Sequence, residues 1–294
     1  MGHDHHHHDH TTGNIKVAFI LNTAFTLIEI VGGLYTNSVA ILSDAVHDLG
    51  DTVSLGLSWY FQHLSKKKHD DKYSYGYKRF SLMGAIITSI ILLLGSVYII
   101  AETIPRLINP EPTKTEGMIA LAILGVIVNG AAVLRLRKGN SINERVVSLH
   151  LLEDVLGWAA VLVGSIIMYF WDLPIIDPLL SIGIAIFILS NIYKNLKQSF
   201  QIILQGTPRD VDIDEIRNVI LTKKEVHSIH DCHVWTMDGE YKVFTAHVVL
   251  HENFDIKALD RIKSEIKDCL KNEHIDHITI EFENVESDPC PQMS

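Results

Sequence analysis

The stretch FSLMGAIITSIILLLGSVYIIAETI, residues 80–104, decides the fold class of this 294-residue chain. Glu102 is its single charged side chain, and a helix that crosses a membrane needs about 20 predominantly apolar residues. Five other stretches have the same character: residues 15–34, 39–62, 117–134, 146–170 and 174–193. We therefore predict a membrane-embedded bundle of six transmembrane helices within residues 15–203, in contact with the lipid bilayer.

The segments between the predicted spans alternate between rich and poor in basic residues. The rich segments follow the second, fourth and sixth spans and contain Lys66, Lys67, Lys68, Lys72, Lys78, Arg79, Arg135, Arg137, Lys138, Arg145, Lys194, Lys197 and Arg209. Basic segments of membrane proteins stay on the cytoplasmic side. An even number of spans then places both termini in the cytoplasm, and we expect an integral protein of the inner (plasma) membrane.

The two ends of the chain differ in composition from the spans. Residues 1–14 are rich in histidine, which is typical either of an expression tag or of a flexible tail that binds metal cations. Residues 205–294 carry 19 Asp and Glu against 10 Lys and Arg, close to the whole net charge of −10. This acidic balance excludes nucleic acid as a partner and favours cationic ligands. The cysteines Cys232, Cys269 and Cys290 form no CxxC pair, so a reducing compartment is expected.

Residues 204–294 are predicted to form a separate α+β domain. Amphipathic patterns indicate helices over 212–222, capped by Asp212, and over 255–272. Alternating patterns indicate strands over 227–237, 241–250 and 277–283, the first two joined at Asp238-Gly239. The order α-β-β-α-β suggests a small ferredoxin-like domain. Such a domain has a modest core, and we expect it to pair with a copy of itself.

Two of the predicted spans carry the same pair of ionisable side chains. His47 and Asp51 lie four residues apart in the second span, as do His150 and Asp154 in the fifth, so each pair shares one helix face. If these faces pack together, two imidazoles and two carboxylates converge as a tetrahedral set that suits Zn²⁺. The two carboxylates would also neutralise the charge of the ion.

Other interpretations of the polar residues stay open at this stage. Asp44 and Asp48 are also four apart, and spacing alone does not choose between them and His47/Asp51; the repeat in the fifth span favours the latter. Polar residues within spans can also line a wet cavity or pair structurally. We expect structural roles for Asn22 and Glu29, and a capping role for Asp177.

These residues and several motifs resemble the cation diffusion facilitator family, in its bacterial zinc, cobalt and cadmium efflux branch. The resemblance spans nearly the whole chain: EIVGGLYTNSVAILSDAVHD (29–48), YGYKR (75–79), DPLLS (177–181), HDCHVW (230–235) and TAHV (245–248). It implies a homodimer that moves Zn²⁺ out of the cytoplasm in exchange for H⁺ by alternating access. It also implies that His47, Asp51, His150 and Asp154 form the transport site.

The resemblance further implies metal ligands in the C-terminal domain at His233, His247 and Glu283, where a solvated sheet face is the alternative. His227, His230, His251, His274 and His277 are interpreted mostly as surface residues. Some relatives bind metal in the loop after the second span, but here Tyr73 and Tyr77 occupy the histidine positions, so we expect no strong site there, although His69, Asp70 and Asp71 leave weak binding open.

The expected function is efflux of a divalent metal, Zn²⁺ first, with protons as counter-ion. Histidine binds metal only when neutral, so metal and protons compete for His47 and His150. Alternatives are the same transport with Cd²⁺ or Co²⁺ preferred, or a membrane metal sensor that does not transport. An enzyme is not expected, because four protein ligands leave no position open for water on zinc.

Overall fold

The computed structural model describes residues 7–136 and 142–285. Contacts divide the chain into two compact units, Met1–Tyr60 with Gly84–Asn195, and Phe61–Met83 with Leu196–Ser294. The first unit holds the body of the helical bundle. The second combines the C-terminal domain with the loop between the second and third helices. Much of the predicted tail over residues 1–14 lies outside the described residues, and from His7 on its backbone belongs to the first helix.

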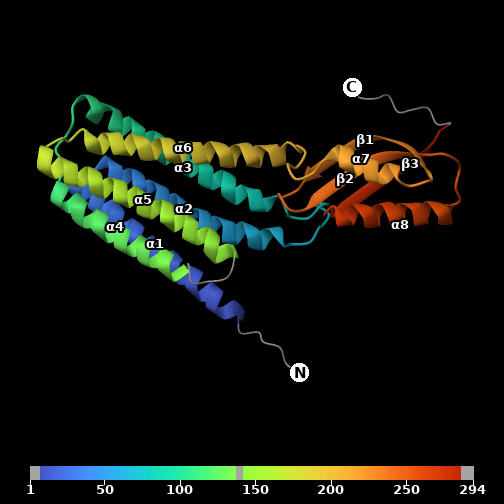
Figure 1. The fold of residues 1–294 in the computed structure, drawn as a ribbon, viewed down its shortest axis with the longest axis horizontal. Helices are drawn as coiled ribbons and strands as arrows, with labels where there is room; N and C mark the ends of the chain where they lie inside the picture. Colours follow the sequence, from blue (N-terminus) through green and yellow to red (C-terminus); the bar gives the residue numbers. More distant parts are fainter. Residues whose placement is uncertain (1–6, 137–141, 286–294) are drawn as a thin grey trace. The chain divides into compact units, whose positions relative to one another are not determined.

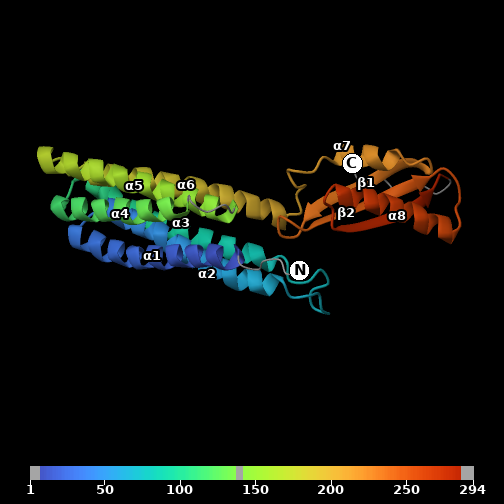
Figure 2. The same ribbon diagram turned by 60° about the horizontal axis from the view of Figure 1, so that its bottom comes forward.

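The part of the chain before the C-terminal domain folds into long helices that run beside one another in the first unit (Figures 1 and 2). Their bounds are α1 His7–Thr36, α2 Val39–Ser65, α3 Phe80–Ile108, α4 Thr115–Leu136, α5 Ile142–Trp171 and α6 Ile176–Ile203. Each predicted span falls on one of these helices. Many large apolar side chains point outward, including Leu94, Ile127 and Phe170, as expected for a surface in lipid.

Among the described residues, four helices are long and apolar enough to cross a membrane: Phe80–Ile108, Thr115–Leu134, Ser148–Trp171 and Ile176–Ile203. Helix α2 is not one of them, because His47 and three aspartates lower its mean hydropathy. Helix α1 contributes the shorter apolar stretch Thr23–Thr36. Four of the six predicted spans are thus both long enough and apolar enough to cross a membrane. That α1 and α2 also cross the membrane is part of the proposal below.

The first turn of α2 is held by an aspartate from another helix. The carboxylate of Asp177, in the first turn of α6, accepts hydrogen bonds from the N–H groups of Val39 (2.8 Å) and Ala40 (3.3 Å) and from the hydroxyl of Ser38. Ser38 itself accepts from the N–H of Ile41. The predicted capping role of Asp177 is confirmed, with the difference that it caps α2 rather than its own helix.

A tryptophan joins the helices at the centre of the bundle. Trp158 on α5 is fully buried and meets the ring of Phe25 on α1 edge to face, with ring centroids 5.5 Å apart. Helix α4 presents Gly125 to the indole, and a Cβ at this position would lie 2.3 Å from the ring. The absence of a side chain at Gly125 is therefore what lets α4 approach the tryptophan.

The C-terminal domain contains α7 Ile213–Leu221, β1 Val226–Thr236, β2 Lys242–Leu250, α8 Ile256–Asn272 and β3 His277–Asn284. The predicted element order is confirmed. Asp212 caps α7 by accepting from the N–H groups of Asp214 and Glu215, and Gly239 turns the β1–β2 hairpin with a φ of +99°. In Figure 1, α7 and α8 lie beside the strands. Their side chains Ile216, Ile220, Ile262, Ile266 and Leu270 pack on one face of the sheet.

The ferredoxin-like arrangement is not confirmed. The sheet has the order β1-β2-β3, with β1 and β2 antiparallel and β2 and β3 parallel. A ferredoxin-like domain inserts another strand between the two strands of each β-α-β unit. Here the described domain has no strand before α7, so α8 returns the chain directly beside β2. The result is a three-stranded mixed sheet with helices on one face and the other face free for polar side chains.

Candidate metal-binding sites

Helices α2 and α5 bring their two His-x-x-x-Asp pairs together. The Nε2 atom of His150 lies 2.8 Å from Oδ2 of Asp51, and the Nε2 atom of His47 lies 3.7 Å from the same oxygen. The rings of His47 and His150 are 6.0 Å apart between centroids. One carboxylate oxygen thus stands between two imidazoles from two helices.

The fourth member of this set, Asp154, is buried on α5, one turn after His150. It is close enough to interact electrostatically with His150 and Asp51, and its Oδ2 atom has no hydrogen-bond partner among the described residues. The Nδ1 atom of His47 is likewise buried without a partner. Buried polar atoms normally have partners. His47, Asp51 and Asp154 thus each keep an unpartnered ligand atom, but the ligand atoms of the four residues do not all lie within 4.8 Å of one another in the described structure.

Three more carboxylates are buried in the same region of the bundle. Glu29 on α1 and Asp44 and Asp48 on α2 are all less than a tenth exposed. Both oxygens of Glu29 and one oxygen of each aspartate have no hydrogen-bond partner among the described residues. The structure buries Asp44 and Asp48, the pair that spacing alone did not separate from His47 and Asp51. The neighbourhood of the His-x-x-x-Asp pairs is therefore strongly acidic.

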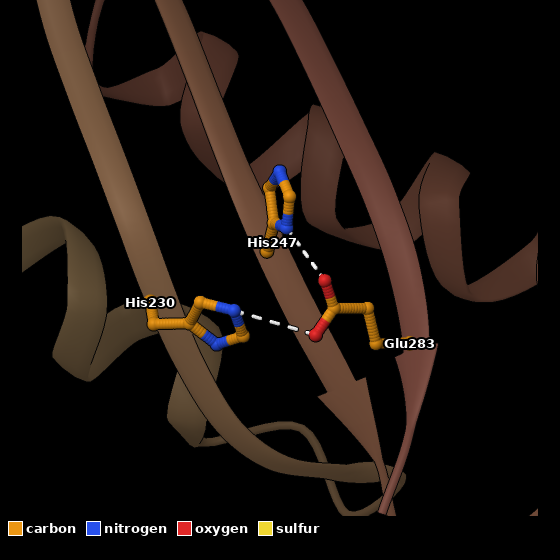
Figure 3. A group of neighbouring side chains, drawn as sticks. All are labelled: His230, His247 and Glu283. Carbon is orange, nitrogen blue, oxygen red and sulfur yellow. Dashed lines mark hydrogen bonds and ion pairs between the residues drawn. The ribbon is translucent and has the colours of Figure 1, made fainter. Parts of the chain in front are cut away.

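The open face of the C-terminal sheet carries a second candidate site, formed by one residue from each strand. His230 on β1, His247 on β2 and Glu283 on β3 point toward one another, with their ligand atoms all within 4.8 Å (Figure 3). Glu283 lies 2.6 Å from Nδ1 of His247 and 3.3 Å from Nε2 of His230. We call these residues the sheet cluster. Each is partly buried, which limits competition from solvent.

A β-bulge decides which histidine of β1 joins the sheet cluster. His230 pairs with His247 in register, and the register shifts before the next pair, His233 with Thr245. Asp231 sits in the bulge with a φ of +50°. The bulge puts both histidines on the open face, but His233 is displaced along the strand. Its Nε2 atom lies 2.8 Å from Asp231, and its side chain is 62% exposed.

Of the three residues expected here, the structure therefore brings His247 and Glu283 together and leaves His233 outside. His230, interpreted from the sequence as a surface residue, takes the third place. Simple alternation along β1 puts His230 and His233 on opposite faces, and the bulge removes that distinction. The available signal was the aspartate between them, because Asp tolerates the left-handed conformation that bulges use.

The other histidines and the loop after α2 show no comparable group of three ligands among the described residues. His227 and His251 stack with ring centroids 4.9 Å apart, and His277 meets the ring of Tyr75. In the loop, the hydroxyl of Tyr77 donates a 2.8 Å hydrogen bond to Asp70, which holds the pKa of that carboxyl below its usual range. The tyrosine thus occupies the carboxylate that a loop metal would need.

Comparison with known proteins places both units in one family. The family model described as "Cation efflux transmembrane domain" matches residues 15–204, and "Cation efflux protein, cytoplasmic domain" matches residues 208–285. The chain belongs to the cation efflux family. This is the cation diffusion facilitator family that the sequence motifs resemble, so that expectation is confirmed.

Relatives of this cation efflux protein are bacterial metal transporters. A cadmium, cobalt and zinc/H⁺–K⁺ antiporter of Bacillus subtilis is 34% identical over 94% of this chain and 91% of its own length. The metal cation efflux system protein CzcD of Cupriavidus metallidurans is 34% identical over 98% of this chain and 91% of its own. The zinc transporter ZitB of Escherichia coli is 31% identical over 96% and 93%.

A solved structure, the metal-bound C-terminal domain of the CzcD transporter from Cupriavidus metallidurans, is 32% identical, covering 25% of this chain and 99% of that chain, with a TM-score of 0.21. The family and its relatives are transporters rather than enzymes. Together with the four apolar helices, membership of the cation efflux family makes this chain an integral membrane protein with a C-terminal domain of the cytoplasmic type.

Proposed function

We propose that this protein exports divalent metal cations, Zn²⁺ first, from the cytoplasm in exchange for protons. The transported ion binds between α2 and α5, on His47, Asp51, His150 and Asp154. Family membership supports metal efflux. The 2.8 Å approach of His150 to Asp51 carries the assignment of the site, because it joins the two His-x-x-x-Asp pairs across two helices.

The ligand set favours zinc. Imidazole nitrogen and carboxylate oxygen in a group of four suit the tetrahedral coordination of Zn²⁺. Two carboxylates balance the two charges of the ion, which lowers the cost of holding it among apolar helices. Cd²⁺ and Co²⁺ accept the same donors, and affinities of one site for divalent ions follow a common order, so both remain candidate substrates.

Proton exchange follows from the same ligands. A neutral imidazole binds metal and a protonated one does not, so loading the site releases protons and protonation releases the metal. A site that opens to one side of the membrane at a time then exchanges one for the other. The B. subtilis relative is named as an antiporter with H⁺, which supports this coupling.

The proposal includes six spans with both termini in the cytoplasm, an arrangement supported by the alternation of basic residues between helices. It also includes a homodimer, with pairing through the C-terminal domains. The sheet cluster of His230, His247 and Glu283 binds a regulatory metal ion from the cytoplasm. Two imidazoles and one carboxylate leave a coordination position open for water or for a further ligand.

Flux in proteoliposomes tests the transport site. Purified wild type and the Asp51→Asn variant are reconstituted, a pH gradient is imposed, and uptake of Zn²⁺, Cd²⁺ and Co²⁺ is followed with an internal metal dye. Asp51→Asn removes the charge that faces both histidines, and we expect its zinc flux to fall at least about a hundredfold. Asp71→Asn, in the exposed loop, carries the same chemical change and is expected to retain full flux.

The outcomes separate the alternatives. Zinc binding without flux in the wild type would identify a sensor. A higher flux of Cd²⁺ or Co²⁺ than of Zn²⁺ would support the proposed site but identify a different preferred substrate. Full flux by Asp51→Asn would rule out the proposed site.

A further inference from the structure

A cavity of about 700 Å³ lies within the second unit, between the α2–α3 loop and the C-terminal sheet. The loop contributes four lysines to its wall: Lys66, Lys67, Lys68 and Lys78. The sheet contributes Tyr241, just before β2, and His277, the first residue of β3. No residue of either candidate metal site lines it. We call it the lysine cavity.

The lysine cavity has positive charge that the surrounding protein does not balance. Lys66, Lys68 and Lys78 make no ion pair with any side chain that the structure describes; Lys78 instead packs over the ring of Tyr241, with Nζ 4.1 Å from its centroid. Lys67 donates to the hydroxyl of Tyr77 at 3.2 Å, a hydrogen bond that raises the pKa of Lys67 and keeps it charged.

Three carboxylates close to residues of the lysine cavity already accept hydrogen bonds from other donors. Asp70 accepts from Tyr77, Asp276 accepts from the N–H of Lys242, and Asp238 accepts from the N–H groups of Glu240 and Tyr241. Asp70 lies 3.6 Å from Lys67 and offsets that lysine alone. A bound anion would therefore face a surplus of ammonium groups.

The α2–α3 loop already holds its lysines at the wall of the cavity before any ligand binds. Asp70 accepts from the N–H groups of Lys72 and Tyr73, which closes a turn. Gly76 has a φ of +75°, and a Cβ there would lie 3.2 Å from the carbonyl oxygen of Lys67. The two ends of the loop are thus in direct contact, and little ordering is needed when an anion binds.

We propose that the lysine cavity binds the phosphate group of an anionic membrane lipid. The position of the loop favours this source over free phosphate: Lys66 follows the last residue of α2, and Lys78 lies two residues before α3, a helix apolar enough to cross a membrane. Lysines at this level meet the headgroup layer, and basic clusters next to a span attract anionic lipid there.

Lipid titration of the full-length protein tests the proposal. Short-chain phosphatidylglycerol, phosphatidylcholine or inorganic phosphate is added to detergent-solubilised protein, and bound ligand is counted by native mass spectrometry. The test variant is Lys66→Gln with Lys68→Gln, which removes two unpaired charges. The control is Lys72→Gln with Lys257→Gln, the same charge change at two exposed lysines outside the cavity.

For the wild type we expect phosphatidylglycerol to bind more tightly than phosphatidylcholine, and more weakly as salt rises. The test variant should bind phosphatidylglycerol about tenfold more weakly or worse, and the control should match the wild type. Equal affinities of wild type and test variant would overturn the proposal, as would an equal loss in the control. Saturation by inorganic phosphate without a preference for the lipid would overturn the lipid as the occupant.

Discussion

The Nε2 atom of His150 on α5 lies 2.8 Å from Oδ2 of Asp51 on α2. This contact links two helices that carry the same His-x-x-x-Asp pair. At 2.8 Å the carboxylate of Asp51 can accept a hydrogen bond from a protonated Nε2 of His150, and a metal ion can take the place of that proton. In the proposed transport site the same atoms would therefore hold either a proton or the metal, as the proposed exchange of metal for protons requires.

Zinc affinity at the proposed transmembrane site should decrease as the pH is lowered. Imidazole binds metal only when it is neutral, so protons compete with zinc for His47 and His150 as the pH is lowered. We expect the decrease to be smaller in His150→Gln, because this variant has one imidazole fewer for protons to occupy. Zinc titrations in a His247→Gln background, which removes the sheet cluster, measure this.

His63→Gln, at the exposed end of α2, is the control for the pH experiment and should keep the full dependence. An undiminished dependence in His150→Gln would show that this imidazole does not exchange a proton for the metal.

His230, rather than His233, should be the ligand from β1 in the sheet cluster. Zinc is expected to slow hydrogen exchange in β1–β3 of the wild type, because a metal that joins three strands suppresses their local opening. His233→Gln should keep this protection and His230→Gln should lose it. Hydrogen-exchange mass spectrometry of the full chain resolves these strands. The opposite pattern would restore His233, the residue that the family resemblance implies.

Gly125→Ala should destabilise the bundle. The new methyl group would lie 2.3 Å from the ring of Trp158, and overpacking of this kind costs about 1–3 kcal/mol. Gly130→Ala on the same helix meets no atom within 4 Å and should be neutral or stabilising. Thermal unfolding in detergent compares the two. An equal effect of both substitutions would mean that helix propensity, and not contact with the tryptophan, determines the change in stability.

The ion pair between Asp210 and Lys242 should stabilise the C-terminal domain only above acidic pH. Lys242 Nζ lies 2.6 Å from the carboxylate, and this hydrogen bond holds the pKa of Asp210 below its ordinary value. A lowered folded pKa gives stability that is present above the unfolded value of about 3.9 and lost as pH falls through the folded one.

Asp210 is largely exposed, so Asp210→Asn should lower the free energy of unfolding by less than about 1 kcal/mol at pH 7. The effect should be smaller at about pH 3, below the unfolded pKa of the carboxyl. Urea unfolding at both pH values measures this difference. Asp260→Asn, an exposed aspartate on α8, should change nothing at either pH. A loss that persists in acid would point to a cause other than the ion pair.

Local patterns in the sequence were enough to place the long helices and the elements of the C-terminal domain. Apolar runs and caps such as Asp212 act within one element, so their spacing can be recognised without tertiary structure. The repeated His-x-x-x-Asp pair indicated that α2 and α5 meet, because two buried ionisable pairs need partners. Two features of the structure were not predicted from the sequence, and both depend on contacts between elements.

The first is the strand order, since no local pattern tells whether a strand is inserted beside β2. The second is the sheet cluster, in which the bulge at Asp231 shifts the register and exchanges His233 for His230. Whether a single residue adopts a left-handed conformation depends on how its strand pairs with the next one. Asp177 is a milder case: its capping chemistry was evident, but its partner helix was not.

The link from Asp177 to the first turn of α2 limits how the transmembrane site can rearrange. Helix α2 cannot slide along its own axis relative to α6 without breaking the hydrogen bonds of Val39, Ala40 and Ser38 to one carboxylate. A sliding of α2 that carries Asp51 away from His150 therefore either breaks these hydrogen bonds or takes the first turn of α6 with it.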